Sequence, residues 1–77
     1  MPPIKKNQAL KRLGEAIRDE RKAQGVSQED LALKAEVNRS YMGSVERGEV
    51  NVSVLTLNKV LGVLKRKPSD LFKAAGL

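Results

Sequence analysis

The 77-residue sequence contains no cysteine and no histidine. Without cysteine there is no disulfide scaffold and no thiolate nucleophile, and without histidine there is no imidazole for a Ser-His-Asp triad or a zinc finger. We therefore expect a protein that is not an enzyme and that binds no cofactor, metal ion or small-molecule ligand. The absence of cysteine also favours a cytoplasmic over a secreted protein.

Aromatic residues and long hydrophobic runs are scarce as well. Hydrophobic residues make up 40% of the chain, enough for one compact core, but only Tyr41 and Phe72 are aromatic. The longest apolar run, residues 60–64, falls far short of the roughly 20 residues that cross a bilayer. Residues 1–6 lack the apolar segment of a signal peptide. We therefore expect no association with a membrane.

Acidic residues are outnumbered by basic ones, nine to fifteen, which gives a net charge of +6. This balance favours polyanionic partners. The charge is uneven: residues 1–24 carry +4, residues 25–50 carry −2 and residues 51–77 carry +4. The excess positive charge therefore lies in the flanks, and by itself it would fit RNA or a membrane surface as well as duplex DNA.

The first part of the chain divides into an arm and a long helix. Residues 1–6, with two prolines and two lysines, are predicted to form a flexible basic arm. From residue 7 apolar side chains recur on one helical face: Leu10, Leu13 and Ile17. Gly25 suits the left-handed position that ends such a helix. The folded domain is expected to span residues 7–77.

Two short helices are expected next, each opened by a capping residue. Ser27, with Asp30 three positions later, is typical of a capping box and predicts a helix over residues 28–35. Asn38 is a second N-cap and predicts a helix over residues 39–47. Two caps eleven residues apart with a tight turn between them form a more restrictive pattern than a simple run of charges.

The last third of the chain predicts two further helices. Ser53 caps a fourth helix and Pro68 opens a short fifth one. The fourth helix has a stripe of residues expected to be buried: Val54, Leu57, Val60, Leu61 and Leu64. No segment alternates in the manner of a strand. The sequence therefore predicts an all-α fold with five helices in one domain.

The predicted third helix has a polar face. Met42 and Val45 lie on one side of it, and the opposite arc carries Arg39, Ser40, Gly43, Ser44 and Arg47. Two short helices joined by a tight turn, the second with a polar outer face, are typical of a helix-turn-helix. Glycine at position 43 destabilises the interior of a helix by about 1 kcal/mol relative to alanine. Such a glycine is expected if a ligand must approach the helix backbone closely there. The alternative is an ordinary solvated face.

Several segments together carry a family resemblance: Gly25-Val26-Ser27-Gln28-Glu29-Asp30-Leu31-Ala32, Ser40-Tyr41, Val45-Glu46-Arg47-Gly48 and Pro68-Ser69-Asp70-Leu71-Phe72. Residues 25–71 resemble the phage-repressor/Cro-like helix-turn-helix family, also known as the xenobiotic-response-element family. Within it, Asn38-Arg39-Ser40-Tyr41 and Glu46-Arg47-Gly48 followed by Asn51-Val52-Ser53 look most like the controller proteins of restriction–modification systems. The resemblance implies a compact lambda-repressor-like domain for DNA binding and dimerisation, with the helix-turn-helix in its second and third helices.

The resemblance also implies roles for side chains at the matching positions. DNA bases would be read by Asn38, Arg39, Ser40 and Ser44, and phosphates would be contacted by Ser27, Gln28, Tyr41, Arg47, Asn51 and Ser53. Arg39 is the best single candidate, because a guanidinium can bind guanine O6 and N7 as a bidentate pair. For Tyr41, a half-buried ring packed on the helix flank is an equal alternative. Arg21 and Glu46 are implied to form a structural ion pair.

The partners follow from the size of the domain. One such monomer reads roughly four to six base pairs, so we expect a transcriptional regulator that binds a two-fold symmetric operator in double-stranded DNA as a homodimer. The candidates for the dimer interface are Leu61, Leu64, Leu71 and Phe72, among which the sequence does not separate core from interface. Contact with RNA polymerase would need an exposed patch, which Glu29, Asp30 and Glu49 could supply.

Two other functions stay open. An antitoxin-like module that binds another polypeptide would expose apolar side chains, for example at Leu33 or Phe72. A basic RNA-binding protein would need more aromatic residues for base stacking.

The sequence also departs from the family pattern at two places. Glu36 stands where the family has a glycine, and a left-handed residue with a Cβ costs about 1 kcal/mol. Lys65-Arg66 replace a glycine–hydrophobic pair, so the fourth helix is expected to run longer or to end differently.

Overall fold

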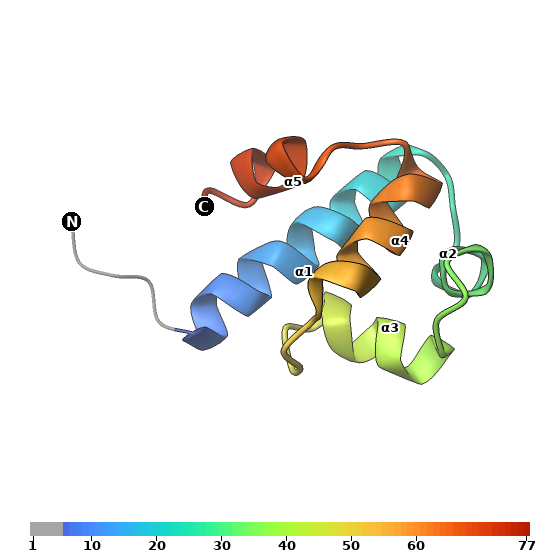
Figure 1. Ribbon diagram of the computed structural model, residues 1–77, viewed down its shortest axis with the longest axis horizontal. Coiled ribbons are helices and arrows are strands. Elements are labelled where there is room, and N and C mark those ends of the chain that lie inside the picture. Colours follow the sequence, from blue (N-terminus) through green and yellow to red (C-terminus); the bar gives the residue numbers. More distant parts are fainter. Residues whose placement is uncertain (1–5) are drawn as a thin grey trace.

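The computed structural model describes residues 6–77, which form five helices and no strand. The helices are α1 (Lys6–Ala23), α2 (Gln28–Lys34), α3 (Arg39–Glu46), α4 (Val54–Leu64) and α5 (Pro68–Ala74). The long α1 contacts both α3 and α5, which lie on opposite sides of it, and α4 contacts α2 and α5 (Figure 1). The all-α prediction is confirmed. Of the predicted arm, residues 1–5 lie outside the described residues, and Lys6 already belongs to α1.

All three predicted side-chain caps are present. The Ser27 hydroxyl accepts a hydrogen bond from the backbone N–H of Asp30 at 3.0 Å. The Asn38 side chain accepts one from Tyr41 at 3.2 Å, and the Ser53 hydroxyl accepts one from Thr56 at 3.1 Å. Each cap satisfies a backbone donor that the first turn of a helix leaves unpaired. These bonds fix where α2, α3 and α4 begin.

The core is aliphatic and draws on all five helices. Its most deeply buried side chains are Ile17, Leu31, Met42, Val60 and Leu64, and Leu71 adds α5 to the cluster. The prediction of burial is wrong for one residue of the α4 stripe, because Val54 is 72% exposed. Val54 is the first residue of α4, and this turn extends beyond the part of the helix that the core covers.

The backbones of α1 and α3 touch through two glycines. A Cβ at Gly14 would lie 2.4 Å from the carbonyl oxygen of Val45 and 2.5 Å from that of Glu46. Gly48, just past the end of α3, has a φ of +72°, and a Cβ there would lie 2.6 Å from the Cα of Lys11. No other residue type fits between these two chain segments. The glycines therefore fix the position of α3 against the long helix.

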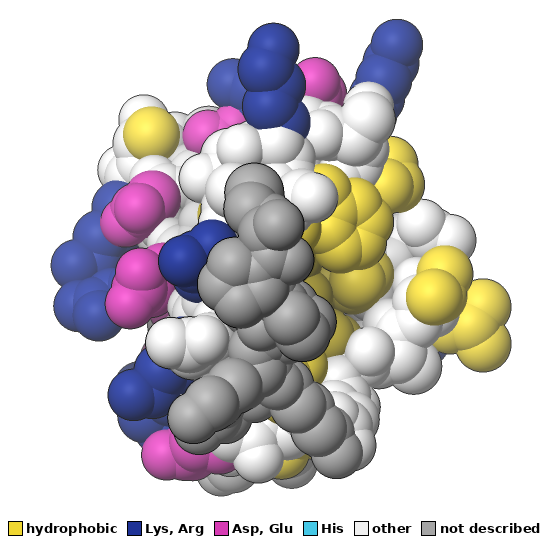
Figure 2. Space-filling view, turned by 90° about the vertical axis from the view of Figure 1, so that its left-hand side faces the viewer, with side chains coloured by type: hydrophobic (Ala, Val, Ile, Leu, Met, Phe, Trp, Pro, Cys, Tyr) yellow, Lys and Arg dark blue, Asp and Glu magenta, His cyan; other side chains and the backbone are white. Residues whose placement is uncertain are grey.

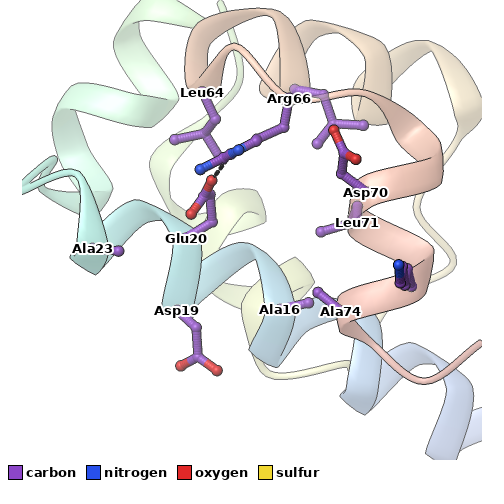
Figure 3. Close-up of a pocket in the computed structure, with 11 residues that line it drawn as sticks. Ala16, Asp19, Glu20, Ala23, Leu64, Arg66, Asp70, Leu71 and Ala74 are labelled. Carbon is purple, nitrogen blue, oxygen red and sulfur yellow. Dashed lines mark hydrogen bonds and ion pairs between the residues drawn. The ribbon is translucent and has the colours of Figure 1, made fainter.

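Both departures from the family pattern adopt left-handed backbone. Glu36 has a φ of 56°, and Lys65 has a φ of 55° as the C-cap of α4. Thus α4 ends at Leu64 and does not run longer. The next residue, Arg66, makes an ion pair with Glu20 of α1. In Figure 3 this pair reaches across one end of a groove of about 520 Å³ that α1, α4 and α5 line.

Within residues 6–77, none of the helices is both long and apolar enough to span a bilayer.

Candidate nucleic-acid interface

The polar face of α3 forms a shallow hollow at the surface. Its lining consists of Gln28 from the start of α2 together with Arg39, Ser40, Gly43, Ser44 and Arg47. Met42 and Val45 point to the opposite side and are buried in the core. The structure thus brings the whole predicted arc together. It adds the Gln28 side chain, which α2 holds at the edge of the hollow.

A buried ion pair joins α1 to α3, the helix that carries this hollow. The Arg21 guanidinium of α1 donates two hydrogen bonds to the Glu46 carboxylate of α3, from Nε at 2.8 Å and from Nη2 at 2.9 Å. The hydrogen bonding to Glu46 raises the pKa of Arg21; burial opposes this rise, and the charge of the carboxylate adds to it. Arg21 also donates to the carbonyl of Val26 at 3.1 Å. The pair therefore ties α1, the turn before α2, and α3 into one unit.

The ion pair also reaches the surface. The side-chain amide of Gln28 donates a hydrogen bond to Glu46 Oε1 at 3.2 Å. One of its two amide hydrogens is used in this way, and the other is free to meet a ligand. Glu46 therefore orients Gln28 at the edge of the hollow.

Arg47 follows the last residue of α3, and its side chain folds back along the helix. Its Nε lies 3.1 Å from Glu49 Oε1, and its Nη2 lies 3.4 Å from the Ser44 hydroxyl oxygen. A Cβ on Gly43 would stand only 3.0 Å from Arg47 Nη1. Glycine at position 43 therefore leaves room for this guanidinium.

Comparison with known proteins identifies the family. Residues 17–71 match the family described as Helix-turn-helix. The chain belongs to the helix-turn-helix family. Its α2 and α3 form the motif, with α3 as the second helix, which confirms the resemblance to the phage-repressor/Cro-like family.

Relatives of this helix-turn-helix protein include transcriptional regulators and controller proteins. The regulator SlrR of Bacillus subtilis is 40% identical over 63 residues, which cover 80% of this chain and 41% of SlrR. The control protein C.SmaI of Serratia marcescens is 38% identical over 65 residues, 84% of this chain and 77% of C.SmaI. The crystal structure of the restriction–modification controller protein C.AhdI from Aeromonas hydrophila superposes with a TM-score of 0.80 at 43% identity, covering 82% of this chain and 96% of C.AhdI. The chain thus spans less than half of SlrR.

The remaining predicted contact residues of this helix-turn-helix protein do not line the hollow. Asn38 and Asn51 are exposed, and Ser27 and Ser53 are exposed with their hydroxyl oxygens engaged in capping. Tyr41 is half-buried and packs against the core, which agrees with the alternative of a ring on the helix flank. Tyr41 belongs to α3, the helix that carries the hollow, and part of its side chain stays exposed there.

Three of the four candidates for a dimer interface are part of the protomer's own core. Leu61, Leu64 and Leu71 are at most 3% exposed and belong to the buried core cluster, at the base of the groove that α1, α4 and α5 line. Phe72 alone is partly exposed, at 39%. Sequence reasoning did not identify the exposed apolar side chains on the first turn of α4. There, Val54 and Leu55 are 72% and 75% exposed. In Figure 2, hydrophobic side chains gather along the right-hand side of the face, over α4 and α5.

Sequence reasoning also missed the glycine contact between α1 and α3. Gly14 lies in the middle of a helix, where glycine is less favourable than other residues. An unfavourable glycine in a helix was the one signal in the sequence that could have indicated a close contact. Its partners, Val45 and Glu46, lie about thirty residues away, so the sequence offers no local pattern that would pair them.

Proposed function

We propose that this protein is a sequence-specific transcriptional regulator of the restriction–modification controller type. It binds a two-fold symmetric operator in double-stranded DNA as a homodimer. The observation that supports this most directly is the hollow on α3, where charged and polar side chains from α2 and α3 line one exposed surface. The relatives C.SmaI and C.AhdI, with their similar length and fold, favour the controller type.

In this proposal α3 enters the major groove with its hollow facing the base edges. Arg39 is exposed on the first turn of α3 and makes no hydrogen bond or ion pair within residues 6–77. Its guanidinium is therefore available to donate two hydrogen bonds to guanine O6 and N7. Asn38, Ser40 and Ser44 supply the remaining contacts to bases. Gln28, oriented by Glu46, is placed to donate to a phosphate at the edge of the groove.

The charge distribution supports separate sources for non-specific attraction to DNA and for sequence recognition. Residues 25–50 carry −2, whereas the segments on either side carry +4 each. Non-specific attraction to the phosphate backbone therefore comes from α1 and the C-terminal third, and specificity comes from a few side chains on α3.

A second copy of the chain is needed to read a site long enough to be unique. The exposed apolar side chains at the first turn of α4 and on α5 are the surface we assign to this contact: Val54, Leu55 and Phe72. Two α3 helices would then lie about 34–36 Å apart, one turn of the duplex. Dimerisation and operator occupancy are coupled, so the concentration of the protein controls the response.

Contact with RNA polymerase is also part of the proposal, through acidic residues beside the DNA-binding face. Glu29 and Asp30 are exposed on the first turn of α2 and are available for it. Glu49 is paired with Arg47 and is less suited to this role.

The test uses duplexes that the wild-type protein selects from a random pool. Arg39→Ala is expected to lower the affinity for the selected site by about 10- to 100-fold and the affinity for a scrambled duplex much less. Asn51→Ala, which removes an exposed contact to a phosphate, is expected to weaken both by the same factor. Equal affinity of the wild type for selected and scrambled duplexes would contradict the proposal. A stable 1:1 complex with another polypeptide, together with weak DNA binding, would favour a protein-interaction module.

A further inference from the structure

The family resemblance implies that Arg47 contacts a phosphate. In the structure its guanidinium lies back over the hollow, with Nη1 beside Gly43 and Nη2 3.4 Å from the Ser44 hydroxyl oxygen. It therefore shares the surface on which Arg39 lies.

Two neighbours determine where the guanidinium lies. Gly43 leaves the space that it occupies, because an added Cβ would stand 3.0 Å from Nη1 and the side chain would have to move. Glu49 pairs with Nε at 3.1 Å from the other side. Glu49 takes the Nε hydrogen and the Ser44 hydroxyl takes one hydrogen of Nη2, so within residues 6–77 the other hydrogens of Nη1 and Nη2 remain for a ligand.

The charge of Glu49 argues against a phosphate as that ligand. Both side chains of this pair are more than half exposed, so a phosphate brought to Arg47 would approach the carboxylate as well and would be repelled by it. A guanine edge carries two acceptors and no net charge, and it does not meet this repulsion.

We infer that Arg47 is a second base-reading arginine, and that Gly43 and Glu49 are the residues that position it. The inference rests on the proposed function, because it assigns a role within the same DNA-binding surface. It predicts that the recognition site contains two base pairs read by arginines, one by Arg39 and a different one by Arg47.

The experiment measures the affinity of each variant for the wild-type-selected duplex and for a panel in which every base pair is changed in turn. The wild type is expected to lose about 10- to 100-fold in affinity when the base pair read by Arg47 is changed. Arg47→Ala is expected to abolish that loss at this one base pair and to leave the preference at the Arg39 position intact. Arg18→Ala, which removes an exposed positive charge from α1, is the matched control and is expected to weaken all duplexes equally.

Two further variants test the positioning. Gly43→Ala is expected to reduce discrimination at the same base pair as Arg47→Ala, and to add no further loss there when the two are combined. Glu49→Gln keeps the shape of the side chain and removes its charge, so discrimination at this base pair should fall while the affinity for scrambled DNA rises. Circular dichroism establishes that each variant is folded.

The inference is overturned if Arg47→Ala weakens every duplex by the same factor and lowers the salt dependence of binding by one counterion, because that is the behaviour of a phosphate contact. It is also overturned if the profile of Arg47→Ala matches that of the wild type at every base pair. A wild-type protein with no preference among duplexes would instead refute the proposed function itself, so the two failures are distinguishable.

Discussion

The contact between α1 and the end of α3 can be tested by the same substitution at two glycines. Gly14 and Gly62 both lie inside helices, where alanine is favoured over glycine by about 1 kcal/mol. At Gly62 the new Cβ meets nothing within 4 Å, so Gly62→Ala should stabilise the fold by about this amount. At Gly14 the new Cβ would lie 2.4 Å from the carbonyl oxygen of Val45 and 2.5 Å from that of Glu46.

The magnitude at Gly14 follows from that geometry. Ordinary van der Waals contact begins near 3.4 Å, so α3 would have to move away from α1 by about 1 Å. Overpacking of this kind costs about 1–3 kcal/mol, and the upper end applies because the obstructing atoms are backbone, which cannot rotate aside. After the gain in helix propensity, Gly14→Ala should destabilise the protein by about 2 kcal/mol.

The assay is thermal unfolding followed by circular dichroism at one fixed protein concentration, because the proposed dimerisation would make Tm concentration-dependent. For a domain of this size 1 kcal/mol corresponds to about 4–8 °C in Tm. Gly62→Ala should therefore raise Tm by about 4–8 °C, and Gly14→Ala should lower it by about 8–16 °C. If Gly14→Ala raised Tm as Gly62→Ala does, the close contact between α1 and α3 would be wrong.

Four other expectations concern stability and assembly. The substitutions Glu36→Gly and Lys65→Gly should each stabilise the fold by up to about 1 kcal/mol, because glycine removes the strain of a Cβ at a left-handed residue. Urea unfolding measures this change, and a loss of stability would contradict the left-handed backbone. Glu46→Ala should cost about 3–5 kcal/mol by leaving the Arg21 charge buried and unpaired. Because the pKa of Arg21 is raised in the folded state, its stabilisation is present at neutral pH and is lost only in strongly alkaline solution, so unfolding near neutral pH should show no transition from this group. Leu55→Glu should shift sedimentation from dimer to monomer, and an unchanged dimer would place the interface elsewhere.

Much of the architecture could be predicted because its signals are local. The caps Ser27, Asn38 and Ser53 each bond to a backbone donor three residues later, and the apolar and polar faces of α3 follow from one helical period. The left-handed backbone of Glu36 was implied by the family resemblance, because the family has a glycine at this position.

Other features depend on which helix lies against which, and no short pattern encodes this. Leu61, Leu64 and Leu71 have the same apolar character as an interface residue would, and only the packing of α1 against α4 and α5 places them in the core. Val54 is exposed because none of residues 6–77 covers the start of α4, although its side chain continues the apolar stripe.

By itself, then, the sequence determined five helices, the caps of three of them, a polar arc on the third and a positive charge carried by the flanks, since each of these depends on residue type and on spacings of a few residues. The tertiary structure decided three things: the glycine contact that sets α3 on α1, the link from the buried Arg21–Glu46 pair to Gln28, and the orientation of the Arg47 guanidinium over Gly43. The first two join segments that lie 18 or more residues apart. The third depends on the rotamer of a long side chain, which is set by its neighbours in space.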